Sequence, residues 1–77
     1  MEKEFMYEIV KPVAILSKSA NGRYTTEVNL ISYNGKPAKL DIRKWDIEKG
    51  KMLKGITLND KEVAALKEAL ENIEVTA

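Results

Sequence analysis

The sequence predicts an α+β fold, in which four antiparallel strands form one sheet and a single C-terminal helix follows. Three observations support this prediction. The first 58 residues contain runs of Val, Ile, Thr and Tyr interleaved with polar residues. Asn-Gly pairs and glycines separate these runs at the intervals typical of short strands joined by tight turns. From residue 59 onward, apolar residues recur at the spacing of one helical face.

The first two strands are expected to form a hairpin. Residues 8–18 are rich in Val, Ile and Leu, and the segment Ser19-Ala20-Asn21-Gly22 supplies a turn in which Asn-Gly tolerates positive φ. Residues 23–33 are dominated by β-branched and aromatic side chains, as in a second strand. The pair Asn34-Gly35 then predicts a second turn.

The last two strands follow this turn. Pro37 cannot donate a ladder hydrogen bond, so the third strand is expected over residues 38–45. Gly50 marks the next turn, and residues 51–58 form the fourth strand. Gly55 lies inside that strand, where a glycine indicates a bulge or the close approach of another backbone.

The C-terminal helix is predicted to begin after Asn59, a good N-cap residue, with Glu62 placed to complete a capping box. Helical periodicity gives it an apolar stripe opposite an acidic face. The stripe consists of Val63, Leu66, Leu70 and Ile73. These side chains must be buried, either on the chain's own sheet or in an interface with a second copy.

The length of 77 residues allows one domain, residues 1–77, whose own core is marginal. The chain contains no cysteine and no histidine, which excludes disulfides, thiolate metal sites and the commonest zinc ligand. Self-association is the remaining reinforcement, so we expect a homodimer. The N-terminus lacks the features of a signal peptide, and no apolar run is long enough to cross a bilayer. We therefore expect a cytoplasmic protein without membrane contact.

The same inventory disfavours catalysis, because histidine, cysteine and a Gly-rich phosphate loop are missing and no helix or strand pair places carboxylates at ligand spacing. Asp41, Asp46 and Glu48 are candidate ligands for a hard cation, but basic residues stand among them and compete for the same carboxylates. We expect no enzymatic activity, no metal and no cofactor.

Charge is distributed unevenly along the chain, although the net charge is only +1. Residues 33–58 carry seven basic and three acidic residues, whereas residues 59–77 carry two and five. In the predicted third strand, alternation places Leu40 and Ile42 on one face, which is expected to be core. The other face is cationic with one aromatic ring and consists of Lys39, Asp41, Arg43 and Trp45.

Such a face suits single-stranded nucleic acid, because cations follow the phosphates and a flat ring stacks on an unpaired base. Asp41 is expected to orient Arg43 or Lys39 through a charge-assisted hydrogen bond. Taken singly, the lysines also fit a solvated sheet face, and Trp45 fits core packing. The candidate ligand-binding residues, extended over neighbouring strands, are Tyr33, Lys36, Lys39, Arg43, Trp45, Lys51 and Lys54.

Two segments before the predicted helix resemble motifs of a known family. They are Asp41-Ile42-Arg43-Lys44-Trp45 and Lys54-Gly55-Ile56-Thr57-Leu58-Asn59. This pairing resembles the positive cofactor 4 family, transcriptional coactivators that bind single-stranded DNA, and particularly its compact bacterial branch. The resemblance covers residues 8–73 and is strongest from Tyr33 onward.

The resemblance implies a curved four-stranded sheet, a helix in the dimer interface, and a symmetric homodimer with grooves for single strands. Arg43 matches the family's DNA-contacting arginine, Tyr33 the aromatic that ends its second strand, and Lys36 its basic turn. Trp45 matches a tryptophan that stands three residues after the arginine in eukaryotic members and two residues after it here.

The leading prediction is therefore sequence-tolerant binding of single-stranded DNA, or of RNA, by a homodimer that serves transcription, replication or repair. The main alternative is a protein-interaction module that offers an edge strand or the acidic helix to a partner, with lysines that serve solubility. A small structural subunit is a third interpretation.

Overall fold

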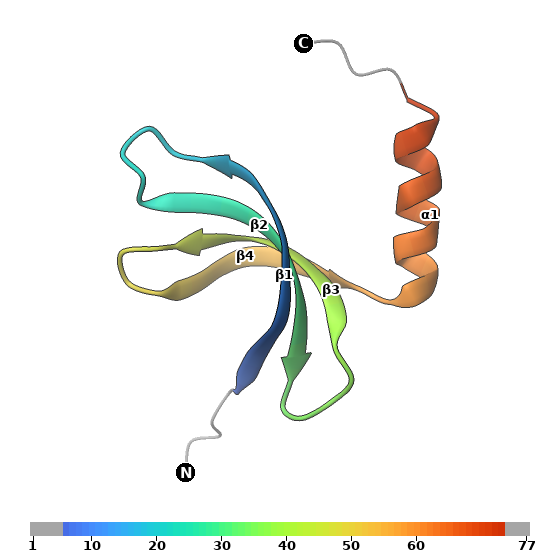
Figure 1. Ribbon diagram of the computed structural model, residues 1–77, viewed down its shortest axis with the longest axis horizontal. Coiled ribbons are helices and arrows are strands. Elements are labelled where there is room, and N and C mark those ends of the chain that lie inside the picture. The colour runs from blue at the N-terminus through green and yellow to red at the C-terminus, as the bar shows by residue number, and fades with distance from the viewer. Residues whose placement is uncertain (1–5, 74–77) are drawn as a thin grey trace.

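The computed structural model describes residues 6–73, which form one antiparallel sheet followed by one helix (Figure 1). The elements in chain order are β1 (Tyr7–Lys18), β2 (Tyr24–Tyr33), β3 (Lys39–Asp46), β4 (Lys51–Leu58) and α1 (Asp60–Glu71). Each strand pairs with the next along the chain, so the sheet order is β1-β2-β3-β4. The predicted fold class and element order are confirmed.

The hairpin between β2 and β3 closes as the sequence predicts. Asn34 and Gly35 are consecutive residues with positive φ, at 53° and 77°. The backbone N–H of Lys36 donates to the carbonyl of Tyr33 at 3.0 Å across this turn. Asn and Gly tolerate positive φ at low cost, and the twist of such a turn matches that of the strands it joins.

The sheet is strongly coiled. The pairing of β1 with β2 contains three register shifts, and bulges of this kind increase the local twist. Tyr7 in β1 and Trp45 in β3 belong to strands that are not neighbours, yet their ring centroids lie 6.0 Å apart. Figure 1 shows β1 crossing over the other strands. The beginning of β1 therefore covers the face of β3 that carries Asp41, Arg43 and Trp45, which we call the inner face.

The inner face is the more buried of the two, which makes the predicted core wrong. Asp41 and Ile31 are fully buried, and Trp45 is 6% exposed. Leu40 and Ile42, the expected core residues, lie on the opposite outer face and are only half-buried. The alternation itself was predicted correctly, but coiling closes one face of the sheet on itself, and here it encloses the more polar face.

Gly55 lies beside a bulge and at a close approach of two backbones, the two features that a glycine inside a strand indicates. The register of β3 with β4 shifts between Arg43 and Trp45, so β4 contains a bulge just before Gly55. Gly55 itself lies directly opposite Arg43, and a Cβ atom added to it would be 2.6 Å from both Arg43 Cα and the Ile42 carbonyl oxygen. Only glycine permits this close approach of two strands.

Helix α1 begins as predicted and stands apart from the sheet. Asn59 accepts a hydrogen bond from the Glu62 N–H, and the Glu62 side chain accepts one from the Asn59 N–H, which completes the capping box. Among the described elements α1 contacts only β3 and β4, and it contains no buried residue. Figure 1 shows the helix extending away from the sheet. No helix within residues 6–73 is long and apolar enough to cross a membrane.

Replacing Gly55 with Ala should destabilise the fold by about 1–3 kcal/mol, because the new methyl group overlaps the backbone of β3. Urea denaturation measures the loss. Lys54→Ala, at the neighbouring exposed position, is the matched control and should change the free energy of unfolding by less than about 0.5 kcal/mol. Equal stability of Gly55→Ala and wild type would contradict the close approach.

Candidate functional site

A buried carboxylate joins three strands at the centre of the inner face. Arg43 Nε donates to Asp41 Oδ1 at 2.6 Å, and Arg43 Nη2 donates to Asp41 Oδ2 at 2.7 Å. Tyr33 Oη and Thr57 Oγ1 donate to the same Oδ2 at 2.6 and 3.0 Å. Asp41 therefore orients Arg43 through a bidentate charge-assisted pair, as the sequence predicts, and it also ties β2 and β4 to β3.

The guanidinium of Arg43 is largely engaged within the chain. Besides Asp41, Nη2 donates to Tyr33 Oη at 3.2 Å, and Nη1 donates to the Leu53 carbonyl oxygen at 3.0 Å. The Arg43 side chain is 15% exposed. These contacts leave at most one of its five N–H groups for a ligand. Arg43, the expected DNA-contacting residue, is thus first of all the partner that neutralises Asp41.

The pKa values of this network follow from its contacts. Burial by itself would raise the pKa of Asp41, but hydrogen bonds from Arg43, Tyr33 and Thr57 outweigh it and hold that pKa below its usual range. The hydrogen bond to Asp41 raises the pKa of Arg43, and burial, together with Asp41, raises the pKa of the Tyr33 phenol. At neutral pH the network therefore contains a carboxylate, a guanidinium and a neutral phenol.

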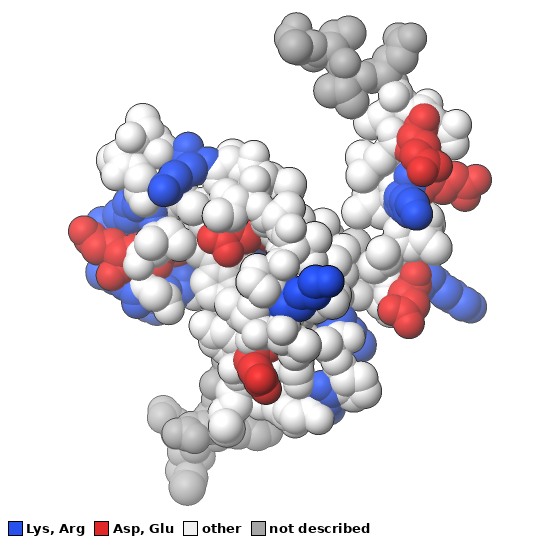
Figure 2. Space-filling model, in the orientation of Figure 1, with Lys and Arg blue, Asp and Glu red and all other residues white. Residues whose placement is uncertain are grey.

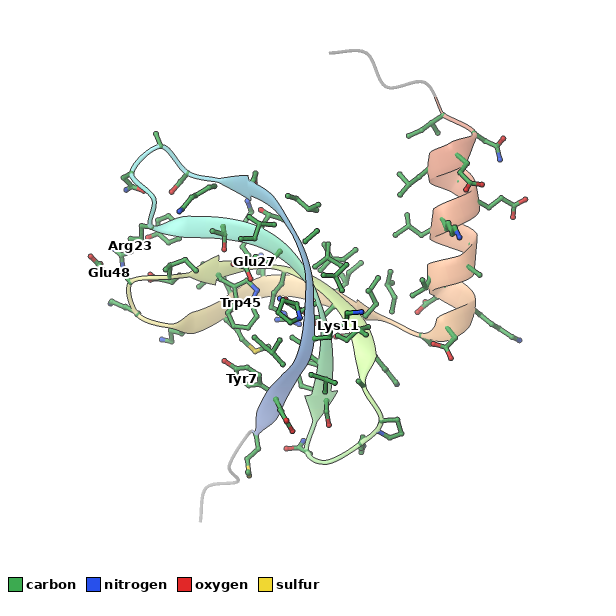
Figure 3. The ribbon with its side chains drawn as sticks, in the orientation of Figure 1. Tyr7, Lys11, Arg23, Glu27, Trp45 and Glu48 are labelled. Carbon is green, nitrogen blue, oxygen red and sulfur yellow. The ribbon has the colours of Figure 1, made fainter. Side chains whose placement is uncertain are left out.

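Trp45 packs inside the coiled sheet. Its ring lies against Tyr7 at an interplanar angle of 53° (Figure 3). The indole N–H is buried and has no hydrogen-bond partner within the described residues. With 6% of its surface exposed, Trp45 offers almost no platform to a base, contrary to its predicted role. Tyr7, at 37%, is the member of the pair that solvent reaches.

A cavity of about 440 Å³ opens next to Tyr7. It is lined by Tyr7, Arg43, Gly50, Lys51, Met52 and Leu53. The beginning of β1 and the β3–β4 hairpin thus meet around one hollow. The sequence did not indicate Tyr7 as a site residue, because nothing in its local pattern shows that the first strand crosses over the third.

The predicted lysines do not form one continuous surface. Lys39 lies on the inner face at the beginning of β3, and Lys36 lies in the turn before it; both are exposed. Lys51 borders the cavity. Lys54 directly precedes Gly55, which lies opposite Arg43, so alternation places Lys54 on the outer face and it does not extend the inner face as predicted.

A second ionic cluster holds the tips of the two hairpins together. Arg23 donates through Nε and Nη2 to the Asp46 carboxylate at 3.1 and 3.0 Å, and its Nη1 lies 3.3 Å from Glu48 Oε1. Figure 2 shows basic and acidic side chains gathered at this end of the sheet. Of the carboxylates weighed as cation ligands, Asp46 and Glu48 are therefore paired with Arg23, and Asp41 is paired with Arg43. The described part of the chain contains no group of three His, Cys, Asp or Glu residues suited to a metal ion.

Comparison with known proteins places these residues within a matched family region. The family model described as Transcriptional Coactivator p15 (PC4) matches residues 22–69. An uncharacterized protein of Treponema pallidum (strain Nichols) is 43% identical over 70 residues, which cover 91% of this chain and 81% of that protein. The residues matched by the family model include all four members of the inner-face network, Tyr33, Asp41, Arg43 and Thr57.

Replacing Asp41 with Asn should cost about 3–5 kcal/mol at pH 7, because it leaves the Arg43 guanidinium partly buried without its counterion. A variant that still folds should also show a changed acid response. The lowered pKa means that the stability from Asp41 is complete above the unfolded pKa of about 3.9 and is lost as pH falls through the folded pKa. Urea denaturation between pH 7 and pH 3 measures both effects.

Asp46→Asn is a comparison variant outside the network: the hydrogen bond from Arg23 also holds the pKa of Asp46 below its usual range, so this variant should likewise lose less stability on acidification than wild type does. Wild type should lose stability more steeply below about pH 4 than Asp41→Asn does. If the free energy of unfolding fell equally with falling pH in wild type and in Asp41→Asn, the ionised Asp41 carboxylate would make no pH-dependent contribution to stability.

Proposed function

We propose that this chain, which belongs to the transcriptional coactivator p15 (PC4) family, binds single-stranded DNA along the inner face of its sheet. The observation that carries the proposal is the cavity beside Tyr7, where a partly exposed aromatic ring and an exposed lysine converge. An unpaired base needs a ring on which to stack, and its flanking phosphates need cations. A duplex hides the faces of its bases, so the cavity favours a single strand.

The contacts are divided between the ends and the centre of the inner face. We assign phosphate contacts to Lys36 and Lys39 at one end and to Lys51 at the other, since all three are exposed and none has an ion-pair partner within the described residues. Tyr7 supplies stacking surface at the cavity, and Trp45 supports it from inside the sheet. The role is binding, in transcription as the family's description indicates, and it needs no catalytic group.

A protein-interaction role through an edge strand is the alternative, and the edges of this sheet argue against it. β1 is one edge of the sheet, and its pairing with β2 contains three register shifts. It also contains Pro12, which cannot donate a ladder hydrogen bond to an added strand. β4 is the other edge, and it also contains a bulge. Bulges and proline are the features that block strand addition in natural sheets.

We also propose that two copies associate through α1 and the outer face. The predicted stripe on and after α1 is uncovered: Leu70 and Ile73 are 57% and 53% exposed, and Val63 and Leu66 are only half-buried. The outer face is apolar and incompletely covered as well, through Val28, Leu30, Leu40, Ile42, Ile56 and Leu58. Two such surfaces on one small chain can cover each other about a twofold axis, which buries both.

Binding should favour an oligothymidylate over a duplex of equal length, and its affinity should fall steeply with salt. Fluorescence anisotropy at several salt concentrations measures both. Lys39→Ala should reduce the slope of log K against log salt concentration by about 0.7, the value for one phosphate contact on a single strand. Lys67→Ala, on the exposed surface of α1, is the control and should leave the slope unchanged. Equal, salt-insensitive binding to both oligonucleotides would favour the interaction module instead.

Arg43→Ala is a poor test of the same proposal. It would leave Asp41 buried without a counterion, so any loss of affinity would be mixed with a loss of folding. The exposed lysines separate the two effects, because surface substitutions change stability little.

Leu70→Asp should convert the dimer into monomer or unfold the chain, because it places a charge in the apolar stripe. Analytical ultracentrifugation gives the mass, and circular dichroism reports the fold. Ala64→Asp adds the same charge at an exposed position of the same helix and should keep the wild-type mass. A Leu70→Asp protein that sediments as wild type does would rule out this interface.

A further inference from the structure

Glu27 is an acidic residue on the face that we propose for a polyanion. It lies in β2, directly opposite Arg43 in the pairing of β2 with β3, and is therefore on the inner face. Its side chain is neither buried nor fully exposed. Arg43 is turned to Asp41, and among residues 6–73 no Lys or Arg forms an ion pair with Glu27. Figure 3 shows Glu27 on the strand next to Trp45.

Two buried neighbours hold the Glu27 carboxylate in place. Thr25 Oγ1 donates to Oε2 at 2.6 Å, and Asn29 Nδ2 lies 3.5 Å from Oε1. Thr25 and Asn29 are 4% and 2% exposed, so both are fixed by the packing of the inner face. A carboxylate has about four acceptor positions, and these contacts use two of them. Glu27 thus keeps acceptor capacity on a rigid support.

The charges of the inner face determine which part of a strand lies over Glu27. Asp41 neutralises Arg43, and Lys18, opposite Thr25 on this face, forms no ion pair with Glu27, so Glu27 adds an uncompensated negative charge near the centre of the face. Phosphates are repelled from it and attracted to the exposed lysines at the two ends. A strand bound in this way presents its bases, and not its backbone, to Glu27.

We propose that Glu27 reads the base above it and selects guanine. The inference rests on the proposed binding of single-stranded DNA. A carboxylate only accepts hydrogen bonds, and guanine is the base whose Watson–Crick edge has two adjacent donors, N1–H and the N2 amino group. Cytosine and adenine offer one amino donor beside a ring-nitrogen acceptor, and thymine offers one N–H between two carbonyl oxygens. The carboxylate therefore pairs with guanine through two hydrogen bonds and meets at least one acceptor on every other base.

The test compares three fluorescent twelve-nucleotide strands: oligothymidylate, the same strand with one central guanine, and the same strand with hypoxanthine at that position. One guanine cannot form a quadruplex within the strand, and hypoxanthine lacks only the N2 amino group. Anisotropy titration of wild type should give about tenfold tighter binding of the guanine strand than of oligothymidylate, with the hypoxanthine strand in between.

Glu27→Gln keeps the size of the side chain and removes its charge, and it should abolish the guanine preference without weakening the binding of oligothymidylate. Glu68→Gln, on α1, is the matched control and should retain the preference. Equal affinity of wild type for all three strands would overturn the role of Glu27 and leave the proposed function intact. A guanine preference that survives Glu27→Gln would overturn it too. Failure to bind any of the strands would instead refute the proposed function, and this inference with it.

Discussion

The buried ion pair between Asp41 and Arg43 is the interaction on which the rest of this structure depends. Transfer of two charges out of water costs several kcal/mol per ion, and the cost is offset only when geometry and further hydrogen bonds are good. Here the pair is bidentate, and Tyr33 and Thr57 complete the coordination of the carboxylate from the two neighbouring strands. A slip of β2 or β4 by one residue would turn Tyr33 or Thr57 to the other face, so the pair also fixes the register.

The burial of this network determines where the apolar residues of the chain go. A coiled sheet encloses one face, and that face here contains Asp41, Asn29 and Thr25 beside Ile31 and Trp45. The aliphatic residues of β2, β3 and β4 are therefore left on the outer face, and α1 adds a second apolar surface without covering them. A chain of 77 residues has little other apolar material for a core. The proposed association with a second copy would cover both surfaces.

The local structure of the chain could be predicted because it depends on short-range physics. Asn34-Gly35, the cap at Asn59 and the period-two pattern of β3 each act within a few residues. The pairing of Asp41 with Arg43 also follows from this pattern, since residues two apart share a face of the strand.

The period-two alternation of residues does not reveal which face of the sheet becomes enclosed when the sheet coils. That outcome depends on the three bulges of β1, and no glycine marks them. This one cause explains three differences from the prediction: Leu40 is not in the core, Trp45 is buried, and Tyr7 lies beside Trp45. The position of Lys54 has a different cause, because plain alternation from Gly55, opposite Arg43, already turns it outward.

In the proposed binding mode, different parts of the inner face attract the strand and distinguish its bases. Because Asp41 cancels the charge of Arg43, the uncompensated positive charge of this face lies on exposed lysines at its ends, whose long side chains can follow a phosphate backbone of any sequence. The centre consists of buried polar groups held by one another, and these groups fix the partly exposed Glu27 carboxylate, an acceptor of the kind that distinguishes bases. In this mode, affinity and base preference would be determined by different residues. A change at a lysine alters the first without disturbing the network, whereas a change within the network alters the fold and the ligand surface together.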